Sequence, residues 1–141
     1  MKKALVLDEL AKYIQDHSIG TVGIDIFKSY QPSPDKNTTT LYEYGGTVPQ
    51  FTFATTAAAW ENPRIQVVNR STDYQKARNK AELVYKLFSN VVNQTIKATT
   101  GSAGSFYLRI TPLQSPYYVT IEKHETMVVA CNYQVMKTLS T

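Results

Sequence analysis

The sequence predicts an α+β fold: a mixed, mostly antiparallel β-sheet with two helices packed on one face and long inter-strand loops. Two segments repeat apolar residues at helical spacing, and several others alternate apolar and polar residues as strands do. An amphipathic helix must bury its apolar stripe, and packing both helices on one sheet buries both stripes. The 141 residues, 43% of them apolar, have the size of a single domain spanning residues 1–141.

The N-terminal part predicts a helix and then a strand. Residues 3–17 form the expected helix, which Ile19 and Gly20 close, and residues 21–28 alternate like a half-buried strand. The apolar stripe of this helix consists of Leu7, Leu10, Ala11 and Ile14, and the apolar side of the strand consists of Val22, Ile24 and Ile26.

Two short strands and two long loops are expected next. Residues 38–44 and 64–70 are rich in β-branched or aromatic residues, which favours strands. Closely spaced prolines make residues 29–37 a loop. The pair Gly45-Gly46 is expected to end the first of these strands. Residues 47–63, which have no clean period, are therefore interpreted as a long, aromatic loop.

The second helix is expected over residues 72–93. Ser71 and Thr72 can cap its N-terminus, with Asp73 near the positive end of the helix dipole. Residues 94–105 are small and polar, which predicts a flexible connection. The apolar stripe of this helix is Tyr74, Ala77, Ala81, Val84, Phe88 and Val91.

Three strands are expected at the C-terminal end. Residues 106–111 form one, Pro112 and Pro116 bound a turn, and residues 117–121 form a short edge strand. The last strand, residues 126–136, is apolar on both sides at its start, which indicates a central position in the sheet.

Composition excludes several classes of protein. The net charge of +4 and the pI of about 9.1 are only mildly basic, and the lysines and arginines are scattered. Cys131 is the one cysteine, so no internal disulfide can form, and it is expected to be a small buried hydrophobe. No stretch has the continuous apolar run of a signal peptide or membrane span, so a soluble, non-membrane protein is expected.

No residue pattern supports catalysis, a cofactor or a metal. The two histidines, His17 and His124, are expected at the surface, far apart in the sequence, and one cysteine with two histidines does not make a zinc site. The glycines lack the context of a phosphate-binding loop. Neighbouring carboxylates are expected on ordinary polar surfaces. These carboxylates are Asp8, Glu9, Glu122 and Glu125.

The second helix carries four basic residues that a nucleic-acid hypothesis could use. Turning about 100° per residue spreads them around much of the polar circumference, and Glu82 interrupts them. A solvated helix face is the simpler interpretation. The four residues are Lys76, Arg78, Lys80 and Lys86.

Aromatic residues in the long loop point instead to protein assembly. Phe51, Phe53 and Trp60 lie within residues 47–63, and aromatic side chains on loops are favourable anchors at protein interfaces. The alternative is that these rings fold back onto the core of their own domain.

The stretch Ile65-Gln-Val-Val-Asn-Arg-Ser-Thr-Asp-Tyr74 and the Ala-spaced helix that it opens resemble the strand-to-helix junction of the tail terminator (tail completion, minor capsid) proteins of long-tailed bacteriophages. The final strand, from Met127 to Val135, is also similar to that family, as is the opening helix followed by Gly20-x-x-Gly23 and a strand. The resemblance follows the element order along most of the chain and the sequence in detail only at the junction.

This resemblance implies a non-enzymatic protein of the virion, located at the head-proximal end of the tail and assembled in the host cytoplasm. It implies a homo-hexameric ring that caps the tail tube, ends tube polymerisation and binds a head-completion or connector protein. Genomic DNA would pass through the lumen without sequence-specific binding.

Within such a ring we expect seven interface residues. Gln50, Phe51, Phe53 and Trp60 are assigned to a neighbouring subunit or the tail tube protein, and Lys28, Tyr30 and Lys36 to the adjoining face. Two alternatives remain: a head-completion or connector subunit on the portal side, and a monomeric phage-encoded protein-binding module. A monomer at high concentration would favour the second.

Overall fold

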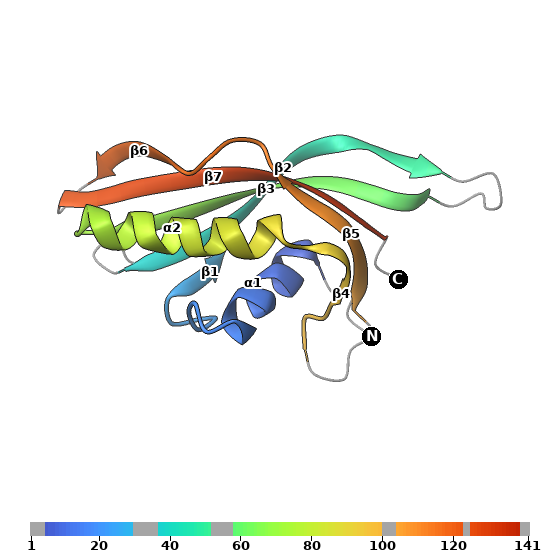
Figure 1. The fold of residues 1–141 in the computed structure, drawn as a ribbon, viewed down its shortest axis with the longest axis horizontal. Coiled ribbons are helices and arrows are strands. Elements are labelled where there is room, and N and C mark those ends of the chain that lie inside the picture. The colour runs from blue at the N-terminus through green and yellow to red at the C-terminus, as the bar shows by residue number, and fades with distance from the viewer. Residues whose placement is uncertain (1–4, 30–36, 52–57, 100–103, 123–124, 139–141) are drawn as a thin grey trace.

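The computed structural model describes residues 5–29, 37–51, 58–99, 104–122 and 125–138, which form two helices and seven strands (Figure 1). The helices are α1 (Val6–Asp16) and α2 (Tyr74–Ser89). The strands are β1 (Ile26–Lys28), β2 (Thr38–Phe51), β3 (Ala58–Ser71), β4 (Val92–Ile96), β5 (Ser105–Pro112), β6 (Tyr117–Glu122) and β7 (Thr126–Thr138).

These strands make one sheet, ordered β1-β2-β3-β7-β5-β4, with β6 beside β7. The pair β1 and β2 is parallel, and the other pairs are antiparallel. The last strand is central, as predicted, because β3 pairs along β7 while β6 and β5 pair with its residues 126–130 and 133–137. The predicted α+β fold with a mixed, mostly antiparallel sheet is therefore confirmed.

Both helices cover the same face of the sheet, as the sequence predicts (Figure 1). Leu10 and Ile14 of α1 are fully buried in the same cluster as Phe88 of α2, whose ring meets Tyr133 of β7 edge-on at 5.1 Å between centroids. Burying each large apolar side chain of this kind stabilises the folded state by about 1.5–3 kcal/mol. The predicted burial of Cys131 is confirmed, since this side chain is 2% exposed.

The prediction of a long loop over residues 47–63 is wrong. Strand β2 continues to Phe51, and β3 starts at Ala58, so most of this segment is a β-hairpin. The Gly45-Gly46 pair lies at a register shift between Tyr44 and Thr47, after which the ladder with β3 resumes. A β-bulge interrupts the apolar alternation without ending the strand, which explains why the segment shows no clean period.

Three boundaries also differ from the prediction. The first strand is only Ile26–Lys28, because residues 21–25 form a turn in which the Thr21 carbonyl accepts three backbone N–H groups. Helix α2 ends at Ser89 rather than near residue 93. The predicted flexible connection over residues 94–105 instead contributes to β4, which pairs with β5. Tertiary pairing overrides the weak local preference of this polar segment.

The start of α2 is capped by Asp73, whose Oδ1 accepts the backbone N–H of Gln75 at 2.9 Å. The sequence predicted Ser71 or Thr72 in this role. Ser71 acts one step earlier, because its hydroxyl oxygen accepts the N–H of Asp73 at 3.1 Å. The helix begins two residues later than predicted, so the capping position moves with it.

A polar cluster lies inside the core. Glu9 is fully buried, so its predicted place on a polar surface is wrong. One carboxylate oxygen of Glu9 accepts the Tyr107 hydroxyl at 2.8 Å and lies 3.0 Å from Lys137 Nζ. The other accepts the Ser105 hydroxyl at 2.7 Å. The fully buried Lys137 also lies 3.3 Å from Glu61 Oε1. A buried charge requires partners of this kind, and α1 supplies one to the end of β7.

Candidate assembly interface

The β2–β3 hairpin extends beyond the part of the sheet that the helices cover (Figure 1). We call residues 45–51 and 58–62 the arm. Its ladder pairs Gln50 with Trp60 and Phe51 with Ala58, with register shifts that are typical of a twisted strand pair. One predicted interface residue, Gln50, is thus placed by its backbone opposite another, Trp60, and Phe51 follows Gln50 along β2.

Trp60 is half-buried within the arm. Its ring centroid lies 6.4 Å from that of Phe106 in β5, and its backbone is in register with Thr138 of β7. The indole therefore packs partly on its own subunit, which corresponds in part to the fold-back alternative. The part of the ring that stays exposed is available to another chain.

Lys28, another predicted interface residue, is not brought to the arm. Lys28 ends β1, the edge strand beyond β2, and its Nζ lies 2.6 Å from Asp8 Oδ1 of α1. That ion pair is partly exposed and contributes little to stability. Tyr30, Lys36 and Phe53 lie outside the described residues.

Strand β6 forms an exposed apolar surface that was not among the interface residues predicted from the sequence. All six of its residues are exposed, and Tyr118, Val119 and Ile121 are each about half exposed. Within the described residues β6 pairs only with β7, so its outer edge presents unpaired backbone groups. Exposed apolar edge strands favour pairing with another chain. In the sequence, the apolar run Tyr-Tyr-Val-Thr-Ile directly after Pro116 could have indicated this surface.

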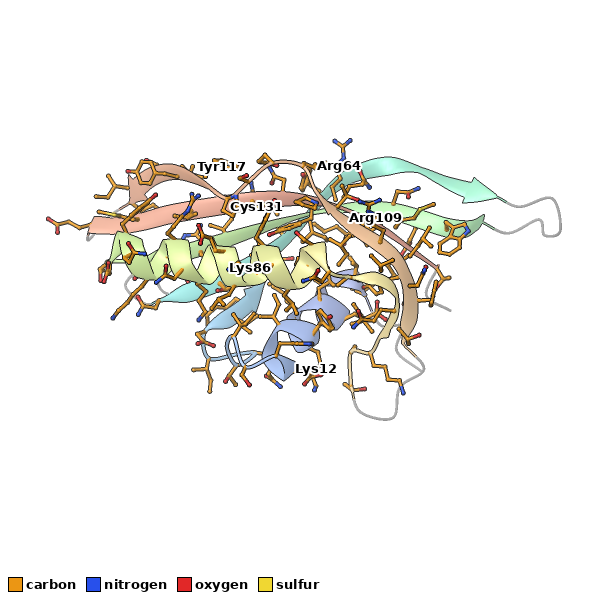
Figure 2. All side chains as sticks on the ribbon, in the orientation of Figure 1. Lys12, Arg64, Lys86, Arg109, Tyr117 and Cys131 are labelled. Atoms are coloured by element: carbon orange, nitrogen blue, oxygen red, sulfur yellow. The ribbon has the colours of Figure 1, made fainter. Side chains whose placement is uncertain are left out.

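A shallow groove of about 280 Å³ adjoins β6 on the sheet face away from the helices. Its floor is apolar, formed by Val68, Val128 and Ala130, and Tyr42 packs against this floor. At one end Arg70 Nε lies 2.9 Å from Glu122 Oε1. Figure 2 shows Tyr117 in the same layer, away from the helices.

Among the described residues no three His, Cys, Asp or Glu side chains gather to hold a metal ion, and neither helix has the length and apolar character of a membrane span. Arg78 of α2 donates to Glu82 and to the Pro116 carbonyl, so its guanidinium is held by contacts within its own chain. His17 caps the end of α1 and is exposed, as predicted, whereas His124 lies outside the described residues.

An open sheet with an exposed apolar edge strand at one end and a projecting hairpin at the other is typical of a subunit that assembles with other chains. The model of the bacteriophage tail terminator protein family matches residues 13–138. The chain belongs to this family, and it is therefore a structural protein of the phage tail.

A solved structure supports the fold. A chain from the virion of a native gene transfer agent particle aligns with a TM-score of 0.55 and 11% sequence identity, covering 95% of each chain. At this identity the likeness establishes a shared fold only. Comparison with curated proteins gives no match.

Proposed function

We propose that this protein caps the tail tube as a closed homo-oligomeric ring, a hexamer, which stops tube polymerisation and offers a docking face to the head-completion or connector protein. One observation carries the proposal beyond family membership. The arm and β6 lie at opposite ends of the long axis of the subunit (Figure 1). A ring requires a head-to-tail interface made from two different surfaces of each copy, and these two ends supply them.

In this arrangement the arm of one copy lies against β6 and the adjoining apolar groove of the next. The outer edge of β6 supplies free backbone groups, and Val119 and Ile121 supply apolar area. Gln50, Phe51, Phe53 and Trp60 then contact the neighbouring subunit or the tube protein. Lys28, Tyr30 and Lys36 belong to the adjoining face. Genomic DNA passes through the lumen without sequence-specific contacts.

The test replaces both exposed apolar residues of β6, as Val119→Lys with Ile121→Lys. Because both side chains are about half exposed, the fold should survive while two charges enter the interface. We expect loss of the ring, seen as monomer mass by light scattering on size-exclusion chromatography, and overlong tails in phage that carry the variant.

The matched control is Leu83→Lys, an equally exposed apolar residue on the outer side of α2, which should leave ring and tails unchanged. Rings of normal mass from the β6 variant would remove β6 from the interface. Rings that bind portal or connector proteins but not tail tubes would instead favour the head-completion alternative.

A further inference from the structure

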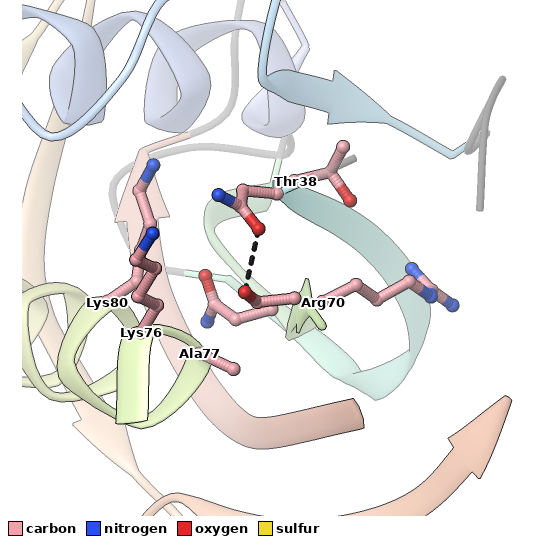
Figure 3. A pocket seen from close by; sticks show the side chains of 8 residues that line it. Thr38, Arg70, Lys76, Ala77 and Lys80 are labelled. Carbon is pink, nitrogen blue, oxygen red and sulfur yellow. Dashed lines mark hydrogen bonds between the residues drawn. The ribbon is translucent and has the colours of Figure 1, made fainter. Parts of the chain in front are cut away.

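A polar cavity of about 180 Å³ lies between the first two turns of α2 and the adjoining ends of β2 and β3 (Figure 3). It is separate from the arm and from β6. Its lining residues are Asn37, Thr38, Asn69, Arg70, Ser71, Lys76, Ala77 and Lys80.

The floor of this cavity contains a hydrogen-bond donor without an acceptor. Asn69 is 1% exposed, and its Oδ1 accepts the Thr39 hydroxyl at 2.6 Å. Its Nδ2 has no partner within the structure described. Buried side-chain donors are nearly always satisfied, so an unsatisfied one that lines a cavity points to a ligand with acceptor oxygens.

The charges around the cavity favour an anion. Figure 3 shows Lys76 and Lys80 extending from α2 along one side, while Arg70 points away from them. The guanidinium of Arg70 pairs with Glu122. Lys80 Nζ lies 3.5 Å from Asp25 Oδ2, whereas Lys76 is exposed and has no ion pair in the described chain. The N-terminal end of α2 adds a positive dipole, part of which the Asp73 carboxylate already uses.

We propose that this cavity binds a phosphate group, which accepts hydrogen bonds from Asn69 Nδ2 and from the ammonium groups of Lys76 and Lys80. The cavity suits one tetrahedral oxyanion rather than a whole nucleotide. The same chemistry can come from free phosphate or from a phosphate of a DNA backbone. The site is independent of ring formation, so it stands or fails apart from the proposed function.

The experiment follows the side-chain amide signal of Asn69 by ¹⁵N NMR while inorganic phosphate is added to the full chain at constant ionic strength. We expect a saturable shift that chloride does not reproduce. Lys76→Ala should weaken phosphate binding about two- to fivefold, because an exposed charge contributes modestly. Lys86→Ala, an exposed lysine at the other end of the same helix, is the matched control and should change nothing.

A second variant tests the donor itself. Asn69→Asp keeps an oxygen to accept the Thr39 hydroxyl but replaces the amide donor with an anionic oxygen, so phosphate binding should fall by about tenfold or more. Because this variant lacks the Asn69 amide, its phosphate binding is followed by the backbone amide signals of Lys76 and Ala77, measured also in the unmodified chain. If this variant does not fold, Lys76→Ala and Lys80→Ala carry the test, since both lysines project from the helix surface. No saturable shift, or equal loss with Lys86→Ala, would overturn the proposal. Displacement of bound phosphate by duplex DNA would assign the backbone as the source, and its absence would assign free phosphate.

Discussion

At the residue scale, the buried pair Glu9 and Lys137 joins the first helix to the last strand. Lys137 continues the alternation of β7 residues that face the helices, from Val129 to Val135, and Glu9 flanks the apolar stripe of α1. Both features are visible in the sequence. Their meeting is not, because 128 residues separate them and no local pattern reports such a contact.

Removing one partner of this pair should be strongly destabilising. Lys137→Met leaves the Glu9 carboxylate buried without its ammonium group, and we expect a loss of about 3–5 kcal/mol in the free energy of unfolding. Urea denaturation at neutral pH measures it. The double variant Lys137→Met with Glu9→Leu should recover much of the loss, because it buries no unpaired charge. A single variant as stable as the wild type would contradict the buried pair.

The buried tyrosines predict alkaline behaviour. Burial, and then the neighbouring Glu9 carboxylate, raise the pKa of Tyr107, and burial raises the pKa of Tyr133. The neutral phenols are therefore favoured in the folded chain, and this stabilisation is complete below the unfolded pKa of about 10 and declines as pH rises above it. We expect phenolate absorbance of these two rings to appear only with alkaline unfolding. Titration of all tyrosines near their ordinary pKa in a chain that stays folded would contradict this.

At the element scale, the start of α2 depends on one side chain. Asp73→Ala removes the acceptor for the Gln75 N–H and should cost about 1 kcal/mol of stability. Thr72→Ala, the neighbouring exposed residue, is the control and should have little effect, because Thr72 does not cap the helix. Chemical denaturation of both variants decides between the two positions, and a larger loss in Thr72→Ala would restore the sequence-based assignment.

The elements predicted best are those with unbroken periodicity. The stripe of α2 and the alternation of β7 each extend over many residues, so both elements were predicted in the right place, β7 nearly at its observed limits and α2 too long at both ends. The long strands β2 and β3 were predicted at half length. A bulge at Gly45-Gly46 breaks their alternation, and Pro63 has no paired residue in the ladder of β3 with β2 or with β7.

At the scale of the whole molecule, the arm provides a second test of assembly. Trp60→Ala together with Phe51→Ala removes aromatic area from two paired strands of the arm. If the arm contacts a neighbour, oligomer mass measured by light scattering should fall and tails should lengthen under the microscope. Trp60→Phe with Phe51→Tyr keeps the aromatic area and should retain the ring. Unchanged oligomers and normal tails in the alanine variant would remove the arm from the interface.

The candidate interface could be predicted only in part. The aromatic residues of the arm were recognised by their type, although the segment that carries them was assigned to a loop. Strand β6 was predicted as an edge strand, but its free, apolar outer edge depends on β5 and β6 both pairing with β7. No pattern in the sequence indicated the cavity at Asn69, because whether an amide lacks a hydrogen-bond partner depends on its neighbours in space.

The fold class, both amphipathic helices and the central last strand could be predicted from residue patterns, because each follows from a repeat of apolar residues within a short segment. The length of the arm, the exposure of β6 and the burial of Glu9 with Lys137 became visible only in the folded chain. Those features arise from strand pairing and helix packing between distant segments, whose energies no local pattern contains.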